Sequence, residues 1–447
     1  MIEGYLEIPD KQTLAALDHV DYSELRKDVF GSIIDQGYPG SKLEDISLIP
    51  RIIPRSHMER IEEACKNLTG AILALASKNK EFLLKHLHPD SRWEKLIHRH
   101  GVLDSVPRRM IGELRYDFAL CGPLTEDNPP LVMEVNAGAL GGVVYASLIP
   151  KIIKQHVPNL DHLSVYDLSE HFVHLCRRIG PHIANFSVGE YSWGESVLAD
   201  YIREKVHFHM VTPVEISDIE YWPGLKRAQW SFDQDKRLRL LLDGHWQAMD
   251  GFRWSRILEH NDIDRFGALL EAVGNGPTTY ISPLRMDYVC HKGILPLLFD
   301  ANFLSQELGI QDTQKVLQHV IPCWQYSNHG FPPSHERKNL VLKQNFGCSG
   351  KKVFVGHGMD EMNGKIYRPE EWVIQKKVDL NQMFSRLMYS QDRPVRMDLG
   401  VFVHYDYVDG RLEYCKVTGM LCRGSQRYKV NLNLGGACIP VLVNDME

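Results

Sequence analysis

Residues 131–142, LVMEVNAGALGG, begin as an apolar run and end in glycines, with Glu134 and Asn136 two positions apart. An apolar run of this length followed by glycines is typical of a buried β-strand that ends in a turn. Successive side chains of a strand point to opposite faces, so Glu134 and Asn136 project from the same face. Hard cations such as Mg²⁺ bind oxygen atoms, above all those of carboxylates. The stretch therefore predicts a strand end with two oxygen ligands for a divalent cation.

A second apolar run, residues 111–122 (IGELRYDFALCG), precedes this stretch and is joined to it by PLTEDNPP, residues 123–130. Two apolar runs around a turn rich in proline, aspartate and asparagine predict a β-hairpin. A hairpin would bring Asp117 alongside Glu134, with Arg115 on the same face. An ion pair between Arg115 and Glu134 is the simpler alternative. The burial of a charged residue between Met133 and Val135 favours a metal site formed by Asp117, Glu134 and Asn136.

About two hundred residues later, residues 340–356 read LVLKQNFGCSGKKVFVG, a strand pattern that contains Lys343 and then Gly347, Ser349 and Gly350. Glycines let successive backbone N–H groups turn inward around an anion, and a lysine at a strand end adds a positive charge. A P-loop is excluded, because it needs four residues between its glycines, a serine or threonine after the lysine, and a following helix. A hairpin turn with a solvated lysine is the alternative.

Three further segments carry residues suited to a nucleotide. The strand pattern EEWVIQKKVDL, residues 370–380, ends near Gln375 and continues through Lys377 and Val378. Lys292 stands at the start of an apolar helical pattern in HKGILPLLFD, residues 291–300. Arg423 and Asn431 lie in GMLCRGSQRYKVNLNLGG, residues 419–436, where arginine and asparagine suit phosphate oxygens. A core strand and a basic surface hairpin are the alternatives for the first and last segments.

Composition limits the classes of function. The 447 residues carry a net charge of −6, which argues against general nucleic-acid binding. No apolar run approaches the ~20 residues that a membrane span requires, and the first residues lack the pattern of a secretory signal. Nine cysteines without a CxxC pair suit reduced thiols. We therefore expect a cytoplasmic protein that binds neither nucleic acid nor membrane.

Together the motifs resemble those of the ATP-grasp family. The resemblance rests on Arg115-Tyr-Asp117 with Glu134-Val-Asn136, on LVLK with GCSG, on WVIQKKV, and on Arg423 followed by NLNLGG. Ordinary ATP-grasp enzymes place the lysine and glycine loop first and the metal strands last, whereas this chain has the reverse order. The order resembles that of the circularly permuted ATP-grasp proteins related to glutathionylspermidine synthase, and the likeness extends over most of the chain.

The resemblance implies an α/β (α+β) protein with a circularly permuted ATP-grasp fold. It divides the chain into a helix-rich N-terminal region, the metal-binding half of the ATP-grasp fold, an inserted pre-ATP-grasp-like α/β domain, and the nucleotide-binding portion, at residues 1–110, 111–170, 171–290 and 291–447. Arg227, Arg253 and Arg256 in the inserted domain are candidates for binding a substrate carboxylate, with interdomain salt bridges as the alternative.

The resemblance also implies the roles of the site residues. Mg²⁺ would be held by Asp117, Glu134 and Asn136, and the catalytic Arg115 and Arg423 would face the transferred phosphate. ATP would be bound by Lys292, Lys343, Gly347, Ser349, Gly350, Gln375, Lys377, Val378 and Asn431, with Gln375 to Val378 forming the hinge that contacts the adenine base.

The activity implied is that of a ligase that uses ATP and Mg²⁺ to convert a carboxylate into an acyl phosphate, which an amine then attacks to form an amide. Its partners would be a small-molecule carboxylate and amine, and a homo-oligomer stays open. One alternative is ligation of an amino acid to a carrier-protein thiol or a peptide. Another is a non-catalytic ATP-binding protein.

Overall fold

A computed structural model of the chain shows an α+β protein. It describes residues 21–35, 46–138, 142–157, 160–186, 202, 205–213, 226–254, 277–346, 352–384, 394–425, 430 and 436–445. Within these residues, no helix is both long and apolar enough to pass through a bilayer.

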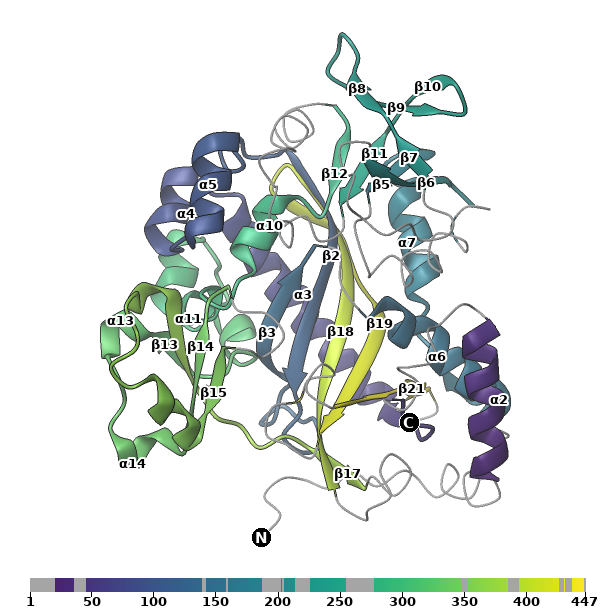
Figure 1. The fold of residues 1–447 in the computed structure, drawn as a ribbon. Helices are drawn as coiled ribbons and strands as arrows, with labels where there is room; N and C mark the ends of the chain where they lie inside the picture. The colour runs from purple at the N-terminus through teal and green to yellow at the C-terminus, as the bar shows by residue number, and fades with distance from the viewer. Residues whose placement is uncertain are drawn as a thin grey trace.

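The central element is an eleven-stranded sheet, whose long middle strands form two hairpins (Figure 1). Strand β2 (Arg109–Ala119) pairs antiparallel with β3 (Leu131–Ala137), so the predicted hairpin is confirmed. On its other side β2 pairs with β18 (Pro394–Val408), which forms a second hairpin with β19 (Arg411–Ser425). Strand β20 (Ala437–Ile439) pairs antiparallel with β19, and β17 (Gln382–Phe384) pairs antiparallel with β18. Segments far apart in the sequence therefore meet along β2.

The same sheet continues into a parallel part. Strand β12 (Thr279–Ile281) lies beside β2 and is followed across the sheet by β11 (Gly251–Trp254), β5 (His182–Phe186), β6 (His207–Pro213) and β7 (Lys226–Ala228). A small antiparallel sheet of β8 (Trp230–Phe232), β9 (Leu238–Leu242) and β10 (His245–Ala248) lies at the top in Figure 1. The region between residues 171 and 290 thus contributes strands to the sheet that contains β2. The predicted domain boundaries stay predictions.

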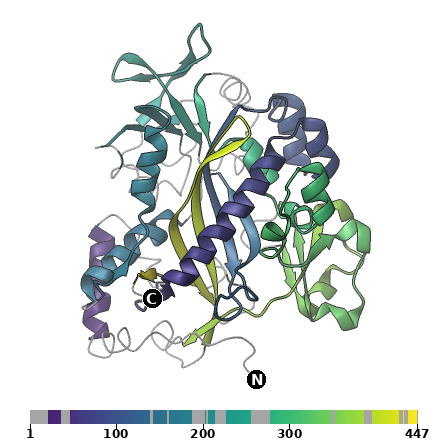
Figure 2. The same ribbon diagram turned by 180° about the vertical axis from the view of Figure 1, so that it is seen from behind.

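Helices cover both faces of the central sheet. Helix α3 (Arg55–Ala76) crosses the back of the sheet (Figure 2), and its Thr69 hydroxyl lies 2.8 Å from the Tyr116 hydroxyl of β2. Its apolar residues recur at helical spacing, a pattern that favours a helix, and the helix begins directly after Pro54. Helices α6 (Val143–His156) and α7 (Leu168–Arg177) pack on the opposite face, in the apolar cluster that includes Ile111 and Phe402, and α2 (Tyr22–Asp35) packs on α6.

Further short elements surround the sheet. Helices α4 (Lys80–His86) and α5 (Ser91–His100) begin at side-chain caps, Asn79 and Asp90, whose oxygens accept from backbone N–H groups of the first turn. A three-stranded sheet joins β1 (Arg51–Pro54), β21 (Val441–Asn444) and β4 (Leu163–Ser164). It ties the start of α3 to the C-terminal segment.

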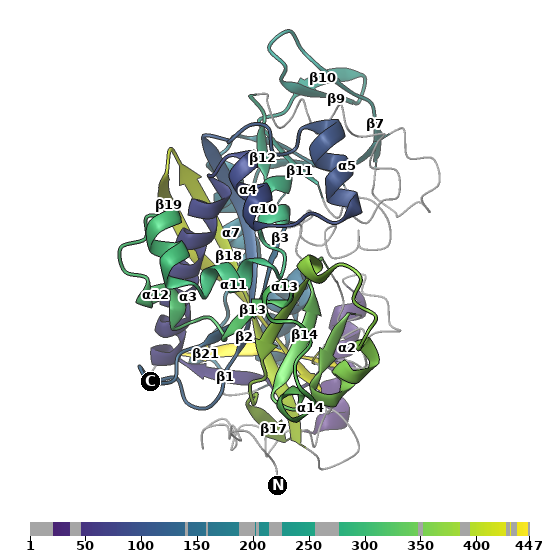
Figure 3. The same cartoon turned by 90° about the vertical axis from the view of Figure 1, so that its left-hand side faces the viewer.

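A separate four-stranded sheet lies beside β3, drawn in green in Figures 1 and 3. Its order is β13 (Cys323–Gln325), β16 (Trp372–Lys376), β14 (Leu340–Gln344) and β15 (Val353–Val355), all antiparallel. Leu342, Ile374 and Trp372 form a core on one face of this sheet. The pattern KKVFVGHG predicts a longer strand than the structure has, because a 3₁₀ helix begins at Gly356 (Gly356–Met362).

Short helices connect the two sheets. Helix α10 (Leu284–Val289) follows β12, and α11 (Ile294–Leu298) begins two residues after Lys292. A π-helical turn (Phe303–Glu307), α12 (Gln314–Leu317), α13 (Tyr326–His329) and α14 (Ser334–Arg337) complete the unit. The backbone N–H of Val132 donates to the carbonyl of His319 at 2.7 Å, which attaches the edge of β3 to the segment leading into β13. The four-stranded sheet is therefore anchored next to β3.

Candidate functional site

The β2–β3 hairpin aligns the predicted metal residues. Asp117 lies opposite Glu134, and Arg115 lies opposite Asn136, so all four side chains leave the same face of the sheet. The register shifts between Asp117 and Phe118, and Met133 has no partner on β2 as a result. Such β-bulges re-aim side chains and occur next to active sites.

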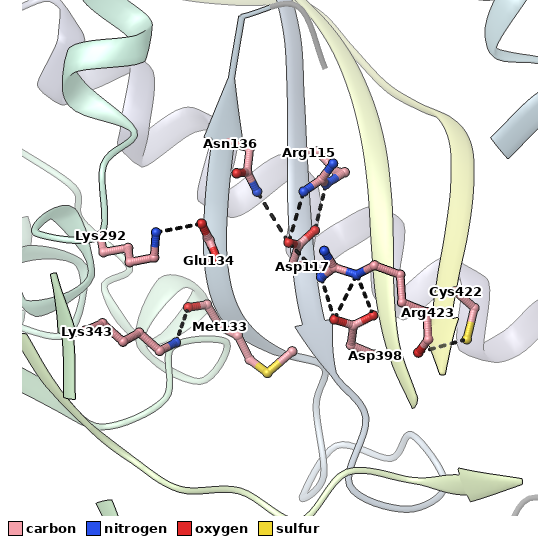
Figure 4. A network of polar contacts seen from close by, with 10 residues as sticks. All are labelled: Arg115, Asp117, Met133, Glu134, Asn136, Lys292, Lys343, Asp398, Cys422 and Arg423. Atoms are coloured by element: carbon pink, nitrogen blue, oxygen red, sulfur yellow. Dashed lines mark hydrogen bonds and ion pairs between the residues drawn. The ribbon is translucent and has the colours of Figure 1, made fainter. Parts of the chain in front are cut away.

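Asp117 is the centre of a buried ion-pair network (Figure 4). Its carboxylate accepts from Arg115 Nε at 2.8 Å and from Arg423 NH2 at 2.9 Å, while Asn136 Nδ2 lies 3.4 Å away. Burial raises the pKa of Asp117, but the guanidinium groups of Arg115 and Arg423 outweigh burial and lower it to about 2. The carboxylate is therefore ionised at neutral pH.

Asp398 completes this network, and the motif analysis missed it. It lies opposite Arg423 across β18 and β19 and accepts from Arg423 Nε at 3.0 Å. Burial raises the pKa of Asp398 in spite of Arg423. Its sequence signal is the one that singles out Glu134, a carboxylate between two apolar residues of a strand, in RMDLG, residues 396–400.

Gly400 leaves the space in which these side chains meet. It lies opposite Asp117 on β18, and a Cβ atom there would stand 3.3 Å from Arg115 Cδ and 3.4 Å from Asp117 Oδ1. A larger residue would press on both partners of the ion pair. We refer to Arg115, Asp117, Asp398 and Arg423 as the Asp117 cluster.

Two lysines approach β3 from the other side. Lys292 Nζ lies 2.8 Å from Glu134 Oε1, and Lys343 Nζ donates to the carbonyl of Met133 at 3.0 Å (Figure 4). Lys343 also donates to Gln375 Oε1 at 2.6 Å. Burial lowers the pKa of Lys343 to about 8, an effect that Glu134 opposes and Lys292 reinforces. The four-stranded sheet thus supplies positive charge directly at the bulge of β3.

The charges of the site do not balance. Among the described residues joined in this network, four cations face three carboxylates: Arg115, Arg423, Lys292 and Lys343 against Asp117, Asp398 and Glu134. The surplus is positive and lies where the two sheets meet, which suits an anionic ligand. The predicted alternative of an Arg115–Glu134 pair is wrong, because Arg115 pairs with Asp117 and Glu134 pairs with Lys292.

The residues predicted to contact the base of a nucleotide lie at the end of β16. The backbone N–H of Lys376 donates to Pro322 and that of Lys377 to Asn339, both at 2.8 Å. Val378 packs against a small apolar cluster that includes Leu380. These contacts hold the strand end in place, and the predicted contacts to a base stay predictions. Gly347, Ser349, Gly350 and Asn431 lie outside the described residues.

The predicted metal ligands fit Mg²⁺ by donor chemistry. Two carboxylates and one amide share a face, and oxygen donors of this kind are what Mg²⁺ takes alongside phosphate oxygens and water. Among the described residues, no three histidine, cysteine, aspartate or glutamate side chains are grouped as a metal site. The fit therefore rests on Asp117 and Glu134 with the amide of Asn136, and the site would need ligands from a bound substrate.

Arg253, a candidate for binding a substrate carboxylate, is engaged inside the protein. Its Nε donates to Glu113 at 3.0 Å and its NH1 to Asn185 at 2.9 Å, with the three side chains buried. His404 Nε2 lies 3.5 Å from Glu113. Arg253 therefore forms a salt bridge, which is the predicted alternative to binding a substrate carboxylate. Arg256 lies outside the described residues.

Comparison with known proteins gives the fold. No protein-family model matches the chain, and no curated protein does. A solved structure of a glutathione synthetase-like effector from Globodera pallida, in its apo form, matches with a TM-score of 0.63 and 13% sequence identity, over 97% of this chain and 98% of that one. A likeness at this identity shows the fold alone. The chain is thus an α+β protein that shares its fold with this glutathione synthetase-like protein.

Proposed function

We propose that the protein is an ATP- and Mg²⁺-dependent ligase that activates a carboxylate as an acyl phosphate and joins it to an amine. The observation that carries the proposal is the surplus of positive charge between the two sheets, next to the aligned Asp117 and Glu134. Phosphoryl transfer asks the protein for positioning and charge neutralisation rather than for a covalent nucleophile.

We further propose that the fold is a circular permutation, related to that of glutathionylspermidine synthase. The order of elements supports this, because the hairpin with Asp117 and Glu134 precedes the four-stranded sheet with Lys343 along the chain. The fold shared with a glutathione synthetase-like protein is compatible with it.

The proposed roles follow from where the charges lie. Lys292 and Lys343 bind phosphate oxygens of ATP, and Arg115 with Arg423 stabilises the transferred phosphoryl group. Mg²⁺ would be held by Asp117, Glu134 and Asn136 and would neutralise the charge that develops on the phosphate oxygens. Lys292 now pairs with Glu134, so the ligand has to draw it away from that carboxylate.

The chemistry has two steps. A carboxylate oxygen of the substrate attacks the γ-phosphorus, the bond to the β-phosphate oxygen breaks, and ADP leaves. The amine then attacks the acyl carbon, inorganic phosphate leaves with the electron pair of the C–O bond, and the new amide loses a proton. Arginines that face the phosphoryl group in both steps make these departures easier, since they stabilise the charge as it forms.

The test is to incubate the purified protein with Mg-ATP and a panel of carboxylates, amino acids, amines and carrier proteins. Release of ADP and phosphate that depends on both substrates is the expected result. Release of AMP and pyrophosphate would overturn the acyl-phosphate step. Thioester formation on a carrier protein, or amide formation on a peptide alone, would instead favour the alternative acceptor.

A further inference from the structure

Gln375 lies beside Lys343 on the face of the four-stranded sheet that meets β3. Val341 is opposite Gln375 and Lys343 is opposite Val373, so Gln375 and Lys343 are diagonal neighbours on adjacent strands. Gln375 is 2% exposed and Lys343 is 7% exposed. A glutamine side chain in this position faces the same space as the lysine ammonium.

The orientation of the Gln375 amide is decided by Lys343. Its Oε1 accepts from Lys343 Nζ at 2.6 Å, whereas its Nε2 is buried and has no hydrogen-bond partner among the described residues. A buried N–H without a partner costs free energy. The opposite orientation would place that N–H against the ammonium, which has only donors. The glutamine therefore forgoes one hydrogen bond and keeps the one to Lys343.

Lys343 needs such a partner because little else holds it. Its other acceptor among the described residues is the carbonyl of Met133 at the bulge of β3, while Glu134 attracts the ammonium and Lys292 repels it. A lysine is a point charge on a flexible stem, so its direction depends on its acceptors. Two neutral oxygens set that direction without neutralising the charge, which a carboxylate partner would do.

We propose that Gln375 is a positioning residue of the nucleotide site, whose side-chain oxygen fixes the direction of the Lys343 ammonium toward the phosphates. The inference rests on the proposed function, because Lys343 is placed at the phosphates only there. The predicted contact to a base involves the end of the strand, whereas the role proposed here belongs to the side chain of Gln375.

A double-mutant cycle tests this coupling. The dissociation constant of ADP is measured by calorimetry with Mg²⁺ present for the wild type, Gln375→Met, Lys343→Met and the double variant. Methionine keeps the length of glutamine and removes its hydrogen bonds. We expect Gln375→Met to weaken ADP binding about tenfold in the wild-type background and less than about twofold in the Lys343→Met background.

Gln344→Met is the matched control. Gln344 lies on the same strand as Lys343 but on the opposite face, where its Nε2 donates to Glu371 at 3.1 Å. ADP affinity in this variant should match the wild type, and thermal melting of every variant verifies folding. An equal loss from Gln375→Met in both backgrounds, or no loss in either, would overturn the inference while leaving the proposed function standing. A wild type that does not bind ADP would overturn both.

Discussion

Two buried clusters of charge lie on the same face of β2, four residues apart, and they differ in their surroundings. The Asp117 cluster joins two carboxylates to two arginines, with Asp117 3% exposed and Arg423 14% exposed. The second, which we call the Glu113 cluster, consists of Glu113, Arg253, Asn185 and His404. Its ionic side chains are at most 2% exposed. Each cluster pairs a strand carboxylate with an arginine, so pairing and burial do not distinguish a site from a structural contact.

The residues and elements around each cluster distinguish the Glu113 cluster from the Asp117 cluster. The Glu113 cluster is built from four strands of one sheet, since Arg253 lies opposite Asn185 and His404 opposite Glu113, and α7 covers it with Phe172. The Asp117 cluster lies instead toward β3, where Lys292 arrives from the segment between α10 and α11 and Lys343 from the four-stranded sheet. A charge network at the junction of two sheets, with a cationic surplus, can exchange partners with a ligand. A network enclosed within one sheet can only stabilise that sheet.

The largest expected effect would come from breaking the enclosed pair. Arg253→Met leaves Glu113 buried with His404 as its remaining charged neighbour among the described residues, and removing one partner of a buried pair typically costs about 3–5 kcal/mol. Urea denaturation of the variant should show a loss of that size. A loss below about 1 kcal/mol would contradict the structural role assigned to the Glu113 cluster.

Glu134→Gln tests the other side of the comparison. The change keeps size and removes the charge that faces Lys292 and, on our proposal, Mg²⁺, so turnover should fall by about 10²–10³-fold. Because Glu134 is partly exposed, with its side chain 30% accessible, stability should change by less than about 1 kcal/mol. ADP and phosphate release measures the first and urea denaturation the second. Full activity in this variant would remove Glu134 from the site.

Acid should weaken the Asp117 cluster in a definite pH range. The pKa of Asp117 falls from its ordinary value of 3.8 to about 2 in the folded chain, so the stability it contributes is present above about pH 4 and is lost as the pH falls toward 2. The contribution is about 2 kcal/mol. Asp117→Asn should therefore flatten the stability profile between about pH 4 and pH 2, measured by urea denaturation. An unchanged slope would contradict the stabilisation of the ionised Asp117 carboxylate by Arg115 and Arg423.

Asp398→Asn should have the smallest effect on stability. Burial raises the pKa of Asp398 even beside Arg423, so the folded chain favours its ionised form less than that of Asp117, and asparagine removes less stabilisation. We expect a loss of about 1 kcal/mol or less at pH 7, together with roughly tenfold slower turnover, because Arg423 loses a charged partner that directs it. A stability loss above about 3 kcal/mol would place Asp398 with the enclosed type of cluster.

The motifs predicted more of this site than their separate strength suggested. Glu134 stands out because burying a carboxylate between Met133 and Val135 on a strand costs free energy unless the carboxylate binds a partner. Alternation along the strand placed it on a face with Asn136, and the turn between the two runs brought Asp117 alongside. Asp398 carries the same local signal, but nothing in its own segment shows which strand lies next to it.

The sequence by itself determined the hairpin of β2 and β3, the helix α3, the strands β14 and β16 and the α+β class of the fold, because periodicity and turn residues act over short distances. Only the tertiary structure decided that Arg253 pairs with Glu113, that Asp398 pairs with Arg423, and that the carbonyl of Met133, at the bulge of β3, accepts from Lys343. Each of these is a pairing between segments remote in the chain. Strand register and burial, which local patterns do not encode, set those pairings.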